Sequence, residues 1–135
     1  MADHNTQIIE EFRANQGKVG GFFDGATLLI LHTRGRKTGK PQTVVLNHLQ
    51  DGDRFVVYGT KGGAPTDPDW VGNVLADPEP TVETGTETIA VRAVEIAGPE
   101  RDQLYQQQVE RRPVFGTYPG KTSRTIPVIA LEPIR

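Results

Sequence analysis

Between two apolar runs the chain carries the stretch His32-Thr33-Arg34-Gly35-Arg36-Lys37-Thr38-Gly39-Lys40-Pro41. This stretch holds four fixed positive charges and no carboxylate, although the whole protein has a formal net charge of −2. The flanking runs, 28–31 and 43–46, are rich in aliphatic and β-branched residues, so the basic stretch is predicted to be the turn of a β-hairpin. A rigid two-stranded arm would hold the charges in a fixed geometry, and their local excess predicts an anionic ligand.

Further strands and helices are expected on both sides of this hairpin. The predicted strands cover about 27–33, 43–50, 54–60, 81–84, 86–96 and 126–131, and an Asp-Gly pair marks a second hairpin turn at 51–52. Short helices are predicted over 6–15, from Pro68 to Ala76 with Asp67 as its N-cap, and over 99–112. The pattern predicts an α+β fold of the split β-barrel type, with about six antiparallel strands and three short helices.

Length and composition predict one domain, 1–135, with an N-terminal helix within 1–19 and the barrel over 20–135. A sequence pI near 5.9 provides no global field for a polyanion, so no nucleic-acid partner is expected. The chain has no Cys, and neither a signal peptide nor a membrane-spanning run is recognisable, so the expected location is cytoplasmic. Peripheral membrane contact through the first helix is left open but weakly supported, because its polar face is acidic.

The basic turn is not a Walker A loop, because its glycines are one residue too close and Pro41 stands where Ser or Thr would hold magnesium. Arg36 can still offer a planar fork to a phosphate or carboxylate. Lys37 and Lys40 add point charges, and Thr38 adds a hydroxyl. The competing interpretation is a solvated basic turn that binds nothing.

A second segment, Tyr58-Gly59-Thr60-Lys61-Gly62-Gly63-Ala64-Pro65, follows a predicted strand and leads into the predicted helix at Pro68. Its glycines would let a ligand approach the bare backbone. On that helix Trp70 could form the wall of a site for a planar ring, and Asn73 could hydrogen-bond the polar edge of the ring. Taken alone, Trp70 is more typical of a core residue and Asn73 of a solvated helix position.

Reactive side chains are few in this sequence. The three histidines, His4, His32 and His48, lack the spacing of a zinc site, so no metal is expected. The single serine, Ser123, is not in a nucleophile elbow. If the protein is a catalyst, a bound cofactor is therefore expected to supply the reactive atom.

Together these segments resemble the family of deazaflavin-dependent nitroreductases, also described as quinone reductases that use coenzyme F420. The resemblance spans about 20–132 and rests on the order and spacing of the basic stretch, Asp51-Gly52-Asp53-Arg54, Lys61-Gly62-Gly63-Ala64-Pro65, Pro68-Asp69-Trp70, Asn73 and Thr125-Ile126-Pro127-Val128. It implies a flavin-type split barrel and an oxidoreductase that transfers a hydride from reduced coenzyme F420 to a small planar acceptor such as a quinone, an enone or a nitro compound.

The resemblance also implies the cofactor site. The phosphate and acidic tail of coenzyme F420 would meet Arg36, Lys37 and Thr38. The deazaflavin ring would lie among Gln42, Thr43, Val44, Val45, Tyr58, Gly59, Thr60, Lys61, Asp69, Trp70 and Asn73. Two positions depart from the family pattern, since Gln42 stands where a basic residue is common and Val45 where Pro is.

The acceptor side is implied in the same way. In the well-studied nitroreductases a cluster of tyrosines lines the acceptor side. The matching positions in this chain are Arg112, Phe115 and Tyr118, so only Tyr118 keeps a hydroxyl group. We expect Phe115 and Tyr118 to bind the acceptor and Tyr118, or solvent, to protonate it, although both aromatic residues also fit a role as loop anchors. Two alternatives to the reductase are left open: a non-catalytic protein that binds or carries coenzyme F420, and a barrel that binds FMN instead. A homodimer is also left open.

Overall fold

The computed structural model describes residues 4–16, 27–77, 79–85 and 87–134, and the statements below refer to these ranges. Six strands form a closed barrel in the order β1-β2-β3-β6-β5-β4, and every neighbouring pair is antiparallel. The strands are β1 (Leu28–Arg34), β2 (Pro41–Asp51), β3 (Arg54–Tyr58), β4 (Thr81–Glu83), β5 (Thr88–Ile96) and β6 (Val128–Pro133). The expected split barrel is therefore confirmed, whereas the predicted boundary at 19/20 lies outside the described residues.

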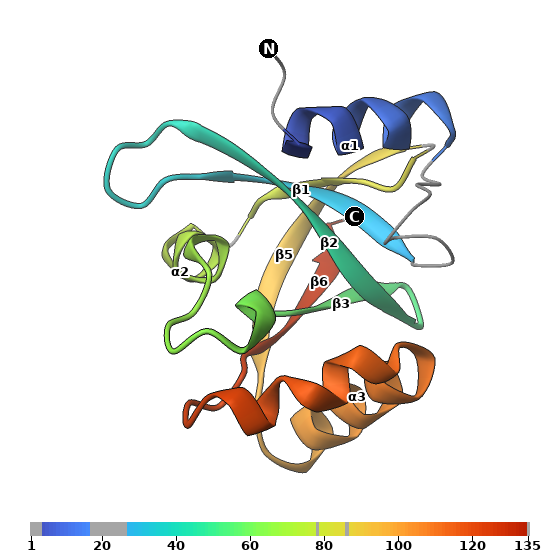
Figure 1. Cartoon of the computed structure of the whole chain (residues 1–135). Helices are drawn as coiled ribbons and strands as arrows, with labels where there is room; N and C mark the ends of the chain where they lie inside the picture. The colour runs from blue at the N-terminus through green and yellow to red at the C-terminus, as the bar shows by residue number, and fades with distance from the viewer. Residues whose placement is uncertain (1–3, 17–26, 78, 86, 135) are drawn as a thin grey trace.

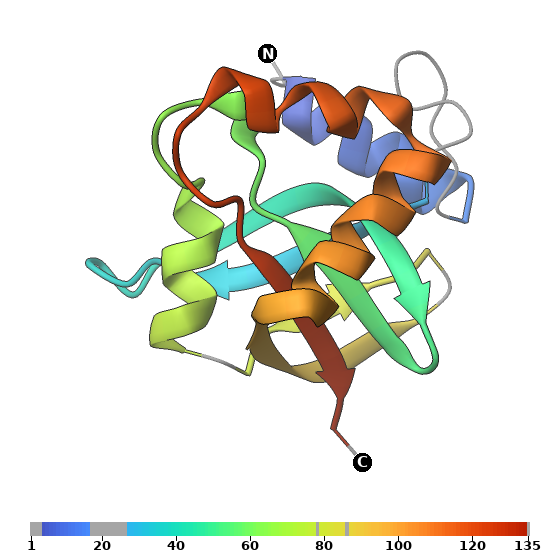
Figure 2. The same ribbon diagram turned by 90° about the horizontal axis from the view of Figure 1, so that it is seen from below.

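The β1–β2 hairpin is the longest arm of the barrel and projects beyond it next to a helix (Figures 1 and 2). Its register runs from Leu28 paired with Asn47 to Arg34 paired with Pro41, so the basic turn occupies 35–40, as predicted. Asp51 pairs with Arg54 at the end of the β2–β3 ladder, and the second turn lies between these two residues. Gly52 in this turn has φ +63°, a conformation that glycine adopts without steric cost.

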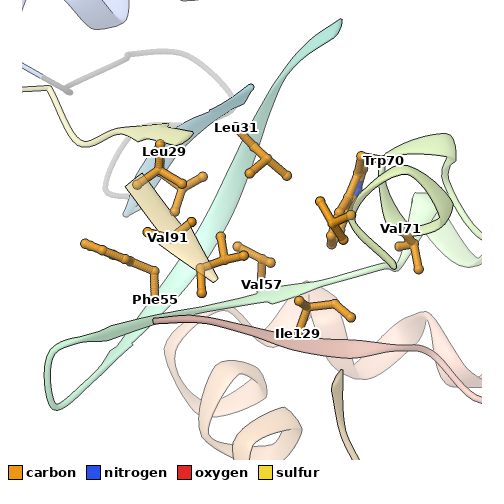
Figure 3. Close-up of a cluster of buried hydrophobic side chains, with 11 residues drawn as sticks. Leu29, Leu31, Phe55, Val57, Trp70, Val71, Val91 and Ile129 are labelled. Carbon is orange, nitrogen blue, oxygen red and sulfur yellow. The ribbon is translucent and has the colours of Figure 1, made fainter. Parts of the chain in front are cut away.

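Alternate residues along the strands face the barrel interior, as a period of two requires. The interior cluster gathers Leu29, Leu31, Phe55, Val57, Val82, Val91, Ile129 and Leu131 (Figure 3). Helix α2 (Asp69–Ala76), inserted between β3 and β4, adds Trp70, Val71 and Val74 to this cluster. The helix thereby packs its apolar face onto one end of the barrel core, and its other face remains available to line a site.

The outward faces of two strand pairs are covered by the remaining helices. Helix α1 (His4–Ala14) places Ile8 and Phe12 against Leu28 and Ile30 on β1. Helix α3 (Gly98–Arg111) packs Leu104 and Tyr105 on the outer side of β3 and β6, in a cluster with Val56, Tyr58, Val128 and Ala130. Short 3₁₀ turns follow at η2 (Lys61–Gly63), η3 (Pro113–Thr117) and η4 (Pro119–Lys121).

The local predictions that are wrong include one helix cap and five strand ends: the ends predicted at 43, 60, 86, 126 and 131 lie two residues away in the structure. Asp67 does not cap α2; the capping residue is Pro68, and Asp67 instead accepts a hydrogen bond from Arg124 Nη1 at 2.8 Å. Strand β3 ends at Tyr58 rather than 60, because the chain turns there into η2, where Lys61 has φ +45°. In the described part of the chain no helix combines the length and apolar character needed to cross a membrane.

Candidate functional site

The hairpin turn is closed by its own backbone. The Gly35 N–H donates to the Lys40 carbonyl at 2.9 Å, and the Gly39 N–H donates to the Gly35 carbonyl at 2.7 Å. Gly39 has φ +72°, which a side chain would strain. The turn thus has a defined shape, and it presents Lys37 and Lys40, which take part in none of the ion pairs among the described residues.

Asn73 of α2 joins this turn to the barrel. Its side-chain oxygen accepts from the Arg36 N–H at 3.1 Å and from Arg36 Nη1 at 3.0 Å, while its Nδ2 donates to Gln42 Oε1 at 2.9 Å. Arg36 Nη1 also donates to the Asp69 carbonyl at 3.1 Å. Asn73 is only 1% exposed, so the interpretation of a solvated helix position is wrong.

Gly72 provides the space in which the Arg36 guanidinium lies. A Cβ on Gly72 would sit 2.8 Å from both Arg36 Cζ and Nη1, closer than real Cβ contacts allow. Arg36 therefore lies flat along α2, and its side chain is still 38% exposed toward solvent. In this position part of the Arg36 guanidinium remains accessible to an anion.

Three adjoining cavities run along β2 from the turn toward η3. The first, the tip groove, has about 200 Å³ and is lined by Gly35, Arg36, Lys37, Thr38, Gln42, Asp69 and Asn73. The second, the middle cavity, has about 200 Å³ and is lined by Thr33, Gln42, Thr43, Val44, Pro68, Asp69 and Trp70. The third, the aromatic cavity, has about 250 Å³ and is lined by Val44, Val45, Leu46, Asn47, Tyr58, Thr60, Lys61, Pro68, Trp70, Phe115 and Tyr118.

Shared lining residues show that these three cavities adjoin, and the row that they form along β2 is called the groove below. Gln42 and Asp69 line both the tip groove and the middle cavity. Val44, Pro68 and Trp70 line both the middle and the aromatic cavities. Trp70 is 6% exposed and belongs to the core cluster, so its interpretation as a core residue is confirmed. It also lines the groove, and its contact with a planar ring stays a prediction.

The aromatic cavity is built on a rigid group of rings. Tyr58 donates its hydroxyl proton to the Leu104 carbonyl at 2.9 Å, and burial raises its pKa. Tyr105 donates to the Phe115 carbonyl at 2.7 Å, and burial raises its pKa to about 12. Phe115 is 6% exposed and packs its ring 5.4 Å from that of Tyr118, so it anchors the loop as well as lining the cavity.

Tyr118 differs from the other two tyrosines. Its hydroxyl forms no hydrogen bond with any residue in the described ranges, and its ring is only partly buried. Since both neighbouring phenols already donate to main-chain carbonyls, Tyr118 carries the phenol proton of this cavity that a ligand could accept.

Arg124 is a site residue that the sequence did not reveal. Its guanidinium donates to the carbonyls of Ala64 at 2.9 Å, Gly59 at 3.0 Å and Thr60 at 2.8 Å, as well as to Asp67. It therefore fixes the segment that supplies Thr60 and Lys61 to the aromatic cavity. No local pattern around position 124 signals this role, because all four acceptors lie roughly sixty residues away in the sequence.

The structure brings the predicted site residues together along this groove, except Gly59 and Lys40, which do not line it. Gly59 lies behind the wall, where a Cβ would approach Val71 Cγ2 to 2.8 Å. A further cavity of about 300 Å³, bordered by His32, Arg34, Asp77 and Glu79, shares Thr33 with the middle cavity and contains none of the predicted site residues. Across the described ranges no group of three or more His, Asp or Glu side chains is arranged to hold a metal ion.

A split β-barrel with a cationic turn beside a cavity that has apolar walls is typical of the class of cofactor-binding split barrels. The donors fit an anionic group at one end of the groove, and Val44 and Trp70 offer apolar surface farther along it. A model of the F420H(2)-dependent quinone reductase family matches residues 5–133. The chain belongs to this family of enzymes, and the resemblance stated from the sequence is confirmed.

Individual relatives agree with this assignment. An F420H(2)-dependent quinone reductase of Mycobacterium tuberculosis is 35% identical over 124 residues, which are 89% of this chain and 83% of the relative. A solved F420-H2 dependent reductase (FDR-A) is 33% identical with a TM-score of 0.72, covering 78% of this chain and 94% of that one. A heme storage protein from Vibrio cholerae, 18% identical with a TM-score of 0.61 over 94% of this chain and 88% of that one, shares the fold alone.

Proposed function

We propose that this protein binds coenzyme F420 in the groove along β2 and reduces a small quinone. The observation that carries the proposal is the row of adjoining cavities from the cationic tip to the aromatic cavity, in which Gln42, Val44 and Trp70 each line two neighbouring cavities. Membership of the family supports the same cofactor and acceptor. The whole chain, 1–135, is proposed to act as one domain.

The tip groove would hold the anionic end of the coenzyme. Arg36, Lys37 and Thr38 line this groove and supply a guanidinium, an ammonium and a hydroxyl, which suit a phosphate or a carboxylate. Asn73, whose amide is committed to Arg36 and Gln42, would act by fixing the tip rather than by touching the ring. Its direct contact with the ring stays a prediction.

The middle cavity would hold the ring system. Trp70 and Val44 offer apolar walls there, and Thr43 and Gln42 add polar groups on the β2 side. When bound, reduced coenzyme F420 supplies a hydride to the acceptor. The chain's own contribution is to hold donor and acceptor in contact and to keep water out, and positioning of this kind accounts for much of the rate gain in such reactions.

The aromatic cavity would receive the acceptor, with Phe115 and Tyr118 as its outer wall. A hydride that reaches a quinone leaves a negatively charged oxygen, which needs one proton to become a hydroxyl. Tyr118 is the proposed source of that proton, because its hydroxyl is not used within the described structure, and solvent is the alternative. Enones and nitro compounds remain proposed acceptors of the same planar, electrophilic kind.

Turnover tests this proposal directly. Purified protein, reduced coenzyme F420 and menadione should show loss of the reduced-coenzyme absorbance at a rate that depends on protein concentration, and Tyr118→Phe should lower kcat at least several-fold. Binding of the coenzyme without turnover of any quinone, enone or nitroaromatic would favour the carrier function instead. A protein that is yellow when purified and retains FMN would favour the flavin alternative.

Oligomeric state and location are separate proposals. A structural relative described as a domain-swapped dimer is 33% identical with a TM-score of 0.72, which supports a homodimer for this chain. Size-exclusion chromatography with light scattering gives the molar mass of the protein in solution and so decides between monomer and dimer. The expected cytoplasmic location stays a prediction.

A further inference from the structure

The edge of β2 that faces away from β1 is only partly paired. β2 has 11 residues and β3 has 5, so β3 reaches only one end of β2. The β2–β3 ladder runs from His48 paired with Val57 to Asp51 paired with Arg54. On this side no strand of the described ranges pairs with residues 41–47, and this stretch is called the open edge below. An open strand edge presents main-chain N–H and C=O groups that are free to bind a ligand.

One main-chain hydrogen bond shows which residues direct these groups toward the open edge. The His48 N–H donates to the Thr27 carbonyl at 2.8 Å, so the main chain of His48 faces β1. The register between β1 and β2 is one-to-one over 41–47, without a bulge. Along an antiparallel strand these groups point to alternate edges. Thr43, Val45 and Asn47 therefore direct their N–H and C=O groups away from β1.

The open edge forms one wall of the aromatic cavity. Four consecutive residues of β2, 44–47, line that cavity. Side chains of consecutive strand residues point to opposite faces, so four in a row line one cavity where the strand presents its edge. Tyr58, Thr60 and Lys61, at and beyond the end of β3, line the same cavity. The aromatic cavity therefore occupies the gap that opens where the chain leaves β3 and turns away from β2.

Val45 is the residue whose main chain faces this cavity with no strand opposite. The β2–β3 register, continued by one residue, sets Asn47 opposite Tyr58 at the end of β3. Thr43 lines the middle cavity instead. The Val45 side chain packs on the apolar cluster beneath α1, so its main chain is the part that a ligand can meet. Within the described ranges the Val45 N–H has no hydrogen-bond partner.

We propose that the Val45 N–H donates a hydrogen bond to a carbonyl oxygen of the quinone in the aromatic cavity. The inference rests on the proposed function. A quinone offers acceptor oxygens and no donor, so the N–H of Val45, and not its C=O, is the group that suits it.

The role of this hydrogen bond follows from the charge that the reaction creates. The quinone accepts a hydride from the reduced coenzyme, which is thereby oxidised, and negative charge develops on a quinone oxygen. The Val45 N–H stabilises that charge, as an oxyanion-hole donor does, and keeps its own proton. One proton from Tyr118 or from solvent then completes the hydroxyl group.

The donor distinguishes this chain from the family pattern. Pro is common at position 45 in that pattern, and proline has no main-chain N–H. A proline is tolerated at a strand edge whose N–H is not used in the ladder. Val45→Pro consequently deletes the proposed donor without removing a hydrogen bond between β1 and β2.

Hydrogen exchange tests the open edge without coenzyme or quinone. In the ligand-free protein, followed by ¹⁵N NMR, the amides of Val44 and Leu46 should exchange slowly because they bond to β1. The Val45 amide should exchange about tenfold faster or more. Exchange of Val45 as slow as that of its two neighbours would overturn the open edge.

The contact itself has a spectroscopic test without turnover. When menadione is added to protein loaded with oxidised coenzyme F420, the Val45 amide proton should shift downfield more than those of Val44 and Leu46. An unchanged Val45 signal at saturating menadione would refute the contact.

Kinetics with reduced coenzyme F420 and menadione test the catalytic role. Val45→Pro should lower kcat about tenfold or more, since loss of one oxyanion-hole donor typically costs about 10²–10³-fold, while the coenzyme Kd stays within about twofold. Val45→Ala shortens the same side chain but keeps the N–H, so its kcat should stay about fivefold or more above that of Val45→Pro. If Val45→Pro does not fold, replacement of Val45 by the corresponding α-hydroxy acid deletes the N–H and should lower kcat equally.

The possible failures are distinguishable. Equal kcat in Val45→Pro and Val45→Ala would refute the donor role and leave the reductase intact. A wild-type protein that binds coenzyme F420 but reduces no quinone would refute both the proposed function and the role of Val45.

Discussion

The side-chain oxygen of Asn73 accepts two hydrogen bonds from Arg36, one from its main-chain N–H at 3.1 Å and one from Nη1 at 3.0 Å. The first fixes the backbone of the hairpin turn against α2, and the second fixes the guanidinium. A helix residue thereby decides where a hairpin presents its positive charge. The geometry of the cationic end of the groove consequently depends on two residues that are 37 positions apart in the sequence.

Removing the Asn73 amide should loosen the turn. Asn73→Ala leaves the Arg36 N–H and Gln42 Oε1 without this partner, and we expect it to lower the free energy of unfolding by about 1–3 kcal/mol. Affinity for coenzyme F420 should fall as well. Urea denaturation and fluorescence titration measure the two effects. The control is Asn15→Ala, at an exposed position just after α1, which removes only an exposed hydrogen bond to the Glu11 carbonyl. An unchanged Kd would show that the tip does not depend on Asn73.

Gly72→Ala separates binding from stability. The new methyl group would displace the Arg36 guanidinium, whose Cζ lies 2.8 Å from the Cβ position, whereas alanine in a helix is favoured over glycine by up to about 1 kcal/mol. We expect a stable protein with several-fold weaker coenzyme binding. In a double-mutant cycle, Gly72→Ala should add little to Arg36→Ala. Additive losses in affinity would contradict this account of Gly72.

Arg124→Lys tests the bracing of the segment from Gly59 to Asp67. A lysine cannot reproduce the fork that reaches three carbonyls and a carboxylate, so the unfolding free energy should fall by about 1–3 kcal/mol. Coenzyme affinity should also fall, because Thr60 and Lys61 lose their fixed position. Arg92→Lys, at a side chain that is 61% exposed, is the matched control. Equal effects of both changes on stability would contradict the bracing role.

His48 should make stability depend on pH. Its pKa is lowered from 6.5 to about 4 in the folded protein, so between these values the unfolded chain binds more protons and acid favours unfolding. The free energy of unfolding should decrease by on the order of 2–3 kcal/mol as the pH falls from 7 to 4. His48→Gln should remove that part of the slope in urea denaturation series. If the free energy of unfolding depended on pH equally in the wild type and in His48→Gln, the titrating group would not be His48.

Much of the fold was accessible from the sequence because its signals are local. The hairpin register around 35–40 follows from two aliphatic runs and the glycines between them. The helix at 69–76 follows from Pro68 and from the prolines beyond Ala76. The failed cap at Asp67 shows the limit of such signals, since a distant guanidinium competes for the carboxylate that would otherwise bond the helix N–H groups.

The rest of the site depends on contacts between distant segments. The burial of Asn73 and the bracing by Arg124 both arise where separate elements pack together. No spacing in the sequence encodes them. Most residues that the family resemblance implies do line the groove. The resemblance did not indicate which of these side chains bond within the protein and which remain for a ligand.

Fluorescence titration of the purified protein with coenzyme F420 tests the central claim most directly. We expect saturable binding that salt weakens, with a Kd raised about tenfold or more in Arg36→Ala and in Lys37→Ala, and unchanged in Arg92→Ala, which removes the same charge elsewhere. Absence of binding at tens of micromolar coenzyme, or equal weakening by all three substitutions, would contradict a coenzyme site at the hairpin tip.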